Sequence, residues 1–120
     1  MEELRPDSME MRFAQLIWER APIPSGDLLP IVEESFGWKK STMYTMLRRL
    51  CQRGIFAIED GLVVTRITRE EFDSRQSHRF VEDSFGGSLP RFLTAFCSRK
   101  SLTDEEIEEL SRLIDEQRRK

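Results

Sequence analysis

The sequence is poor in the residue types on which most enzyme and metal chemistry depends. Its 120 residues include two cysteines, Cys51 and Cys97, and one histidine, His78. Two cysteines do not make a disulfide framework, and a single histidine leaves no cluster of ligands for a metal. The sequence also has no glycine-rich loop to hold a phosphate and no nucleophile with a recognisable base. We therefore expect a protein that is not an enzyme and that uses no metal or cofactor.

Long hydrophobic runs are missing as well. Hydrophobic residues make up 38% of the chain and charged residues 34%, which indicates a charged surface and a small core. No apolar run is long enough to cross a membrane, so we expect no direct membrane insertion. Residues 1–7 are acidic and lack the apolar core of a signal peptide, so we expect a cytoplasmic protein. A core this small is often completed by a second copy of the chain.

Basic residues are concentrated in one stretch, although the formal net charge is −3. Residues 38–54 contain five lysines and arginines and no acidic residue, whereas acids crowd residues 104–109. A local basic stretch in an acidic chain is a candidate electrostatic footprint for nucleic acid. The alternative interpretation is an ordinary solvated helix face.

Hydrophobic periodicity predicts three helices and then a hairpin in the first part of the chain. The helices are expected over residues 7–20, 25–36 and about 41–53, and the hairpin over residues 55–67, around an Asp-Gly turn. Asp7 and Glu10 have the spacing of a capping box for the first helix, and Ser25 is the expected N-cap of the second. Pro30 falls inside the second helix, where it should remove a hydrogen bond or kink the chain.

The rest of the chain returns to helical spacing. Helices are expected from residue 70 to residue 85, from residue 89, capped by Ser88, and from residue 104, capped by Thr103 and Glu106. Their apolar stripes predict a shared dimer core, with a small-molecule pocket as the alternative. The expected dimerisation residues are Phe72, Phe80, Val81, Phe85, Leu89, Phe92, Leu93, Phe96, Ile107, Leu110, Leu113 and Ile114.

Three helices followed by a hairpin are the order of a winged helix-turn-helix, whose third helix enters the major groove of DNA. We therefore predict a mainly α protein, with a winged-helix DNA-binding domain over residues 1–70 and an all-helical dimerisation region over residues 71–120. The candidate DNA contacts are Lys39, Lys40, Ser41, Thr42, Tyr44, Thr45, Arg48, Arg49 and Arg53. Arg49 lies nearer the apolar stripe, so an internal salt bridge is its alternative role. The acidic hairpin tip predicts little phosphate binding by the wing.

The residues of the third helix carry a more specific signal than the order of the elements. Ile17-Trp18 ends the first helix, and a pattern W-x3-T-x-x-T-x-L-x-R-L-x-x-R-G follows from Trp38 to Gly54. With these residues, and with residues 85–88 and 102–110, the chain resembles the penicillinase-repressor (BlaI/MecI/CopY) family over nearly its whole length. The resemblance implies a bacterial transcriptional repressor that binds an inverted-repeat operator in double-stranded DNA as a homodimer.

The resemblance also implies a way in which repression ends. Relatives are commonly released from DNA when their dimerisation segment is cut, under the control of a membrane sensor protease. The aligned bond here is Ala95–Phe96, in a segment expected between two dimerisation helices. The copper-responsive branch has a cysteine-rich C-terminal motif that this chain lacks, so we do not expect copper sensing. The alternatives are a winged-helix protein-interaction module and a regulator that responds to a small molecule or, through Cys97, to redox state.

Overall fold

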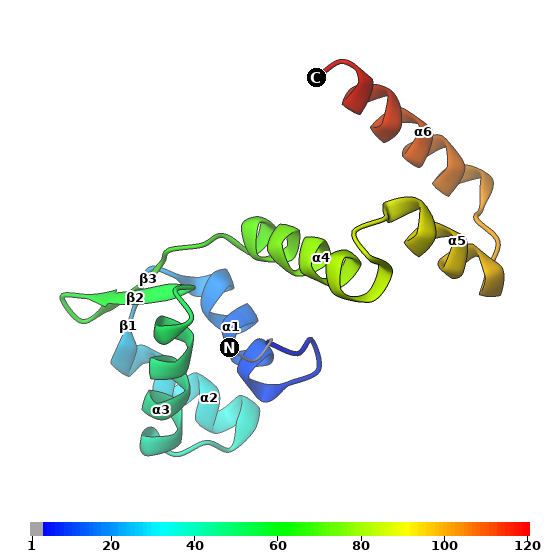
Figure 1. Cartoon of the computed structure of the whole chain (residues 1–120). Helices are drawn as coiled ribbons and strands as arrows, with labels where there is room; N and C mark the ends of the chain where they lie inside the picture. The colour runs from blue at the N-terminus through cyan, green and yellow to red at the C-terminus, as the bar shows by residue number, and fades with distance from the viewer. Residues whose placement is uncertain (1–3) are drawn as a thin grey trace. The chain divides into compact units, whose positions relative to one another are not determined.

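The computed structural model describes residues 4–120; residues 1–3, the start of the first predicted domain, lie outside that range. Within it the chain is mainly helical, as predicted, and Figure 1 shows the order of its elements. They are α1 (Met9–Arg20), β1 (Ile23–Pro24), the 3-10 turn η1 (Ser25–Asp27), α2 (Leu28–Phe36), α3 (Lys40–Gln52), β2 (Phe56–Glu59), β3 (Leu62–Thr65), α4 (Arg69–Phe85), α5 (Leu89–Arg99) and α6 (Asp104–Arg118).

The chain divides into two compact units, Met1–Arg75 and Gln76–Lys120, and the division falls within α4. The first unit holds three helices and the sheet, and the second holds the remainder of α4 together with α5 and α6. The predicted domain boundary at residue 70 stays a prediction.

One hydrophobic core joins the helices and the sheet of the N-terminal unit. Its largest fully buried side chains are Phe13, Ile17, Leu28, Val32, Met43, Leu47, Leu50, Phe56 and Val63. Trp18 extends this core, because its ring packs on Phe56 and its indole nitrogen donates a hydrogen bond of 3.0 Å to the carbonyl of Ile67. Three helices and a hairpin around one core make a winged helix, so the predicted fold is confirmed.

The sheet has three strands rather than the two of the predicted hairpin. β2 and β3 pair around Asp60 and Gly61, whose φ angles of 52° and 79° are both positive, as a two-residue type I′ turn requires. β1 then adds to the other edge of β3, with Ile23 opposite Val63. β1 could not be predicted from the sequence, because a strand of two residues, one of them a proline, is too short to show a period.

Two details of the predicted helix starts are wrong. α1 begins at Met9, because the side chain of Ser8 accepts the hydrogen bond from the backbone N–H of Met11, so Ser8 rather than Asp7 is the cap. α2 begins after the 3-10 turn, so Ser25 is not its N-cap. Pro30 is the third residue of α2, and proline is tolerated in the first turn because amides there need no partner within the helix.

The helices of the C-terminal unit begin where the sequence predicts. The Ser88 side chain accepts from the N–H of Arg91 at the start of α5. Thr103 and Glu106 form the predicted capping box of α6, with hydrogen bonds of 2.8 and 3.1 Å. The hydrogen bonds from the Thr103 backbone and side chain lower the pKa of Glu106, because they stabilise its carboxylate form.

Candidate nucleic-acid interface

The third helix of the winged helix presents one polar face to solvent. Met43, Leu47 and Leu50 are fully buried and hold α3 against α1 and α2. Ser41, Thr45 and Arg48 are exposed on the opposite face, as the helical period predicts. Hydroxyl and guanidinium groups read base edges in the major groove, so this face has the chemistry of a recognition helix.

Positive charge is concentrated at the start of the same helix. Lys39 is the N-cap residue of α3 and Lys40 its first residue, and both side chains are exposed together with Thr42. α3 carries no acidic residue. Two lysines at the positive end of a helix dipole suit contacts with phosphate groups.

Tyr44 is less exposed than the other predicted reading residues and contacts a residue outside α3. Its side chain is half-buried, and its hydroxyl lies 3.3 Å from the hydroxyl of Ser25, at the start of η1. A small cleft of about 270 Å³ lies beside it, lined by Tyr44, Arg48, Cys51 and Ile58. Tyr44 therefore lies on the edge of the reading face that borders the hairpin.

Arg53, a predicted DNA contact, makes an ion pair inside the domain. Its Nε donates to the Glu10 carboxylate at 2.9 Å, and only 20% of the Arg53 side chain and 11% of the Glu10 side chain are exposed. An ion pair that is largely buried favours a structural role for this guanidinium over a contact with phosphate. The pairing joins the start of α1 to the end of α3, two segments that no local pattern connects.

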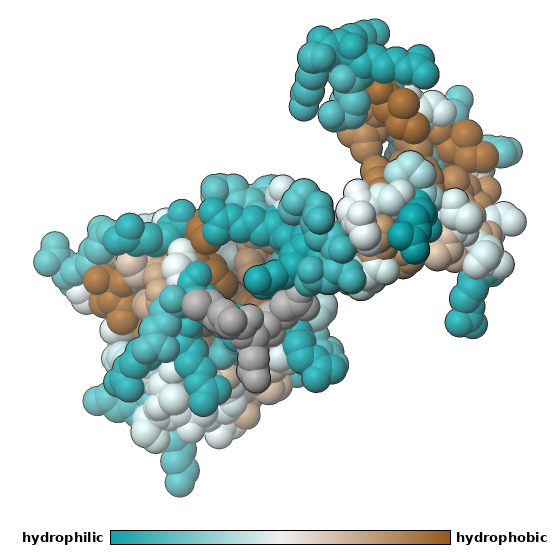
Figure 2. Space-filling view, viewed as in Figure 1, coloured by the Kyte–Doolittle hydropathy of each residue, from teal (hydrophilic) through white to brown (hydrophobic). Residues whose placement is uncertain are grey.

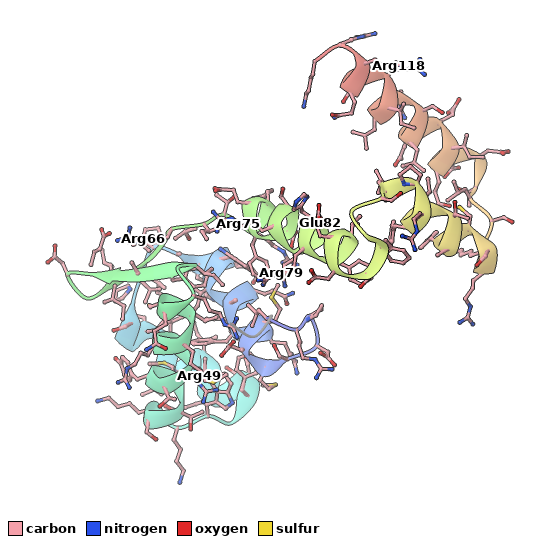
Figure 3. All side chains as sticks on the ribbon, viewed as in Figure 1. Arg49, Arg66, Arg75, Arg79, Glu82 and Arg118 are labelled. Atoms are coloured by element: carbon pink, nitrogen blue, oxygen red, sulfur yellow. The ribbon has the colours of Figure 1, made fainter. Side chains whose placement is uncertain are left out.

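Arg49, unlike Arg53, is not part of a buried ion pair with a described residue. It is exposed, and Figure 3 labels it beside α3. Its one hydrogen bond is a weak one of 3.8 Å to the sulfur of Met46, and no carboxylate of the described residues lies within ion-pair distance. Among the described residues Arg49 therefore makes no internal salt bridge, and its side chain is exposed to solvent.

Gln52 is a candidate that the sequence analysis did not name. It is exposed, and it follows Ser41, Thr45 and Arg48 at the spacing of one helix face. The same helical period, continued by one more turn, would have found it.

The hairpin carries the acidic tip that the sequence shows. Glu59 and Asp60 are exposed there, and Arg66 lies 4.0 Å from Glu59, with both side chains mostly in solvent. A cation beside a carboxylate is a weaker partner for phosphate. The expectation that the wing adds little phosphate binding stays a prediction.

Cys51, next to the apolar stripe of α3, is half-buried. Burial raises the pKa of its thiol, so the thiol stays protonated and poorly reactive near neutral pH. This favours a packing role for Cys51 over redox sensing. Cys97 is half-buried on α5.

The predicted dimerisation residues show an open apolar surface in the C-terminal unit. Phe80, Phe85, Phe92 and Phe96 form a chain of ring contacts, with centroids 5.4–6.2 Å apart. A groove of about 380 Å³ between α5 and α6 is lined by Phe92, Leu93, Phe96, Leu102, Glu106, Glu109, Leu110 and Leu113. Figure 2 shows apolar side chains gathered on these two helices. None of the residues from 76 to 120 is buried.

Two of the predicted positions need correction. Phe72 packs on the ring of Trp18 at 5.4 Å and adds to the core of the N-terminal unit, so we no longer count it among the dimerisation residues. Ala95 and Phe96 lie inside α5 rather than in a segment between two helices, and both are exposed.

Among the described helices, none combines the length and the apolar character that crossing a membrane requires.

The winged helix and the exposed basic face of its third helix define a DNA-binding protein of the winged-helix class. The family model of the penicillinase repressor matches residues 7–116, and the chain belongs to this family of bacterial transcriptional repressors, which are not enzymes. It is 25% identical over 111 residues to the penicillinase repressor of Bacillus licheniformis, covering 89% of this chain and 87% of that protein. It is 20% identical over 112 residues to the methicillin resistance regulatory protein MecI of Staphylococcus aureus, covering 90% and 91%.

Proposed function

We propose that this repressor acts as a homodimer on a pseudo-palindromic operator, with α3 of each subunit in the major groove. The observation that carries the proposal is that α3 joins a buried apolar stripe to an exposed face of hydroxyl, amide and cationic groups, without any acid. Two such helices related by a two-fold axis read two half-sites about one turn of DNA, or a multiple of it, apart. Because its operator is part of the bacterial chromosome or a plasmid, the protein works in the cytoplasm.

The C-terminal unit supports the homodimer. It has no buried residue, yet its helices expose Phe80, Leu89, Phe96, Ile107, Leu113 and Ile114 by 47–61%. Contiguous apolar surface of this kind marks an interface, because leaving it in water costs free energy in proportion to its area. A second copy of the same face supplies matching apolar residues and is always present at equal concentration.

Dimerisation also explains how repression ends. Each winged helix alone makes few base contacts, and tethering two of them raises the effective concentration of the second reader. In the pathway of a membrane sensor protease, the bond that is cut is Ala95–Phe96. The cut separates Phe96 and α6 from the rings of Phe80, Phe85 and Phe92. Because this bond lies inside α5, the helix must unwind locally before a protease can hold it.

The proposal is tested with the full chain and the DNA upstream of its own gene. Footprinting should show a protected pseudo-palindrome, and light scattering should show a dimer at micromolar concentration. The double variant Tyr44→Ala/Arg48→Ala should lose operator binding, whereas the matched variant Arg112→Ala, on the exposed side of α6, should keep it. Unchanged operator binding by the double variant would show that α3 is not the reader.

A fragment that ends at Thr94 tests the release mechanism. It should remain folded in its winged helix, be monomeric, and bind the operator poorly. If it bound as tightly as the full chain, dimerisation and repression would not be coupled.

A further inference from the structure

The two edges of the reading face on α3 differ in character. One edge carries Tyr44 and Cys51 and borders the hairpin, where the small cleft beside Ile58 is largely apolar. The other edge carries Met46 and Arg49 and borders the start of α1. In a winged helix that docks by its third helix, the two edges face the two sugar–phosphate backbones that border the major groove.

The edge toward α1 contains a cleft of about 450 Å³, which we call the arginine cleft. Its lining residues are Leu4, Arg5, Ser8, Met9, Glu10, Met46, Arg49 and Arg53. Three of these are cationic and one is acidic, and that acid, Glu10, is neutralised by Arg53 at 2.9 Å. Its described lining residues therefore carry a net positive charge, and Arg5 and Arg49 supply the charge that the Arg53–Glu10 ion pair does not cancel.

These two arginines are free to meet an anion. Arg49 has no carboxylate of the described residues within ion-pair distance. Arg5 lies 3.8 Å from Asp7, but both side chains are about four-fifths exposed, so water and salt screen this pair strongly. Ser8 also lines the cleft, but its hydroxyl donates to the Arg5 carbonyl at 2.7 Å and caps α1, so the two arginines are the groups that hold an anion there.

The hairpin does not offer a comparable site. Its tip bears Glu59 and Asp60, and Arg66, at the end of the hairpin, lies 4.0 Å from the Glu59 carboxylate. A winged helix ordinarily places its hairpin along the DNA backbone. In this chain Arg5 and Arg49 lie on the opposite edge of α3, away from the acidic hairpin tip.

We infer that the arginine cleft binds a phosphodiester group of the DNA strand that borders α3 on the side of α1. Arg5 and Arg49 hold this phosphate, and it gives the domain a backbone contact that the acidic hairpin tip does not. The inference rests on the proposed function, because it requires α3 to lie in the major groove. Such a contact strengthens binding to every sequence equally and makes binding more sensitive to salt.

The test compares the full chain with its Arg5→Gln/Arg49→Gln variant on two duplexes, the operator and an unrelated sequence of equal length. The matched control is Arg20→Gln/Arg112→Gln, which removes the same charge away from the arginine cleft. Affinities are measured from about 50 to 200 mM sodium chloride. The cleft variant should bind both duplexes roughly tenfold more weakly, and its salt slope should fall by about one. The control should change neither property by a comparable amount.

Further arms separate this inference from other outcomes. Arg5→Lys/Arg49→Lys keeps the charge and should retain most of the affinity, which excludes misfolding as the cause. If the cleft variant and the control bind alike, the inference is overturned, whereas the proposed function stands as long as the unaltered chain binds the operator. A loss confined to the operator would show base reading and would also overturn it. The inference would also be overturned if inorganic phosphate raised the melting temperature of the unaltered chain while the Arg5→Gln/Arg49→Gln variant kept its full affinity for DNA.

Discussion

Replacing Arg53 by alanine should destabilise the fold rather than weaken contacts with DNA. The substitution leaves the Glu10 carboxylate, whose side chain is 11% exposed, without the guanidinium that now lies 2.9 Å away. Removing one partner of a fully buried ion pair costs about 3–5 kcal/mol, because the remaining charge stays desolvated. Arg53 is one-fifth exposed, so water can enter the vacated space. We therefore expect a loss of about 2 kcal/mol in the free energy of unfolding.

Urea unfolding of the full chain measures this loss. Trp18 and Trp38 lie in the affected unit, so tryptophan fluorescence reports on the transition. The double variant Glu10→Leu/Arg53→Met removes both charges at once and should recover most of the stability lost in Arg53→Ala. Glu10→Leu alone should be less costly than Arg53→Ala, since the arginine it leaves behind is more exposed and can reach water.

The salt dependence of DNA binding separates the two roles of Arg53. Measured where both proteins are folded, the Arg53→Ala variant should show the same salt slope as the unaltered chain. An unchanged unfolding midpoint together with a salt slope reduced by about one would refute this reasoning. Arg53 would then contact a phosphate, as its place in the basic stretch predicts.

Three further predictions concern the other parts of the chain. Leu113→Asp puts a charge in the apolar groove between α5 and α6, so the variant should be a monomer in light scattering and keep its winged helix. If the variant remained a dimer, the interface would lie elsewhere. Thr45→Ala should reduce operator affinity by about 1–3 kcal/mol and leave binding to unrelated DNA unchanged. Thr103→Ala should lower the helix content measured by circular dichroism and weaken its acid dependence, because it removes the side-chain hydrogen bonds of the capping box and keeps the backbone one. The lowered pKa of Glu106 gives the cap a stabilisation that is present near neutral pH and lost as the pH falls through that pKa.

The local elements follow from short-range patterns in the sequence. Apolar residues three and four apart mark the buried stripe of α3, and the capping residues of α5 and α6 lie where their spacing predicts. The turn at Asp60 and Gly61 is likewise local, since it depends on two residues that tolerate positive φ. Each of these signals lies within a few residues along the chain, so no knowledge of the packing is needed to recognise them.

The six helices and the hairpin, the winged-helix class and the polar face of α3 can all be predicted from the sequence. The pairing of Arg53 with Glu10, the addition of β1 to the sheet beside β3, and the packing of Phe72 on the N-terminal core appear only in the folded chain. Only folding brings Arg5 to the same cleft as Arg49. The physical reason is that these contacts join segments far apart in the sequence. Their geometry depends on how helices and strands pack against one another, and the period of any single element carries no information about its partner.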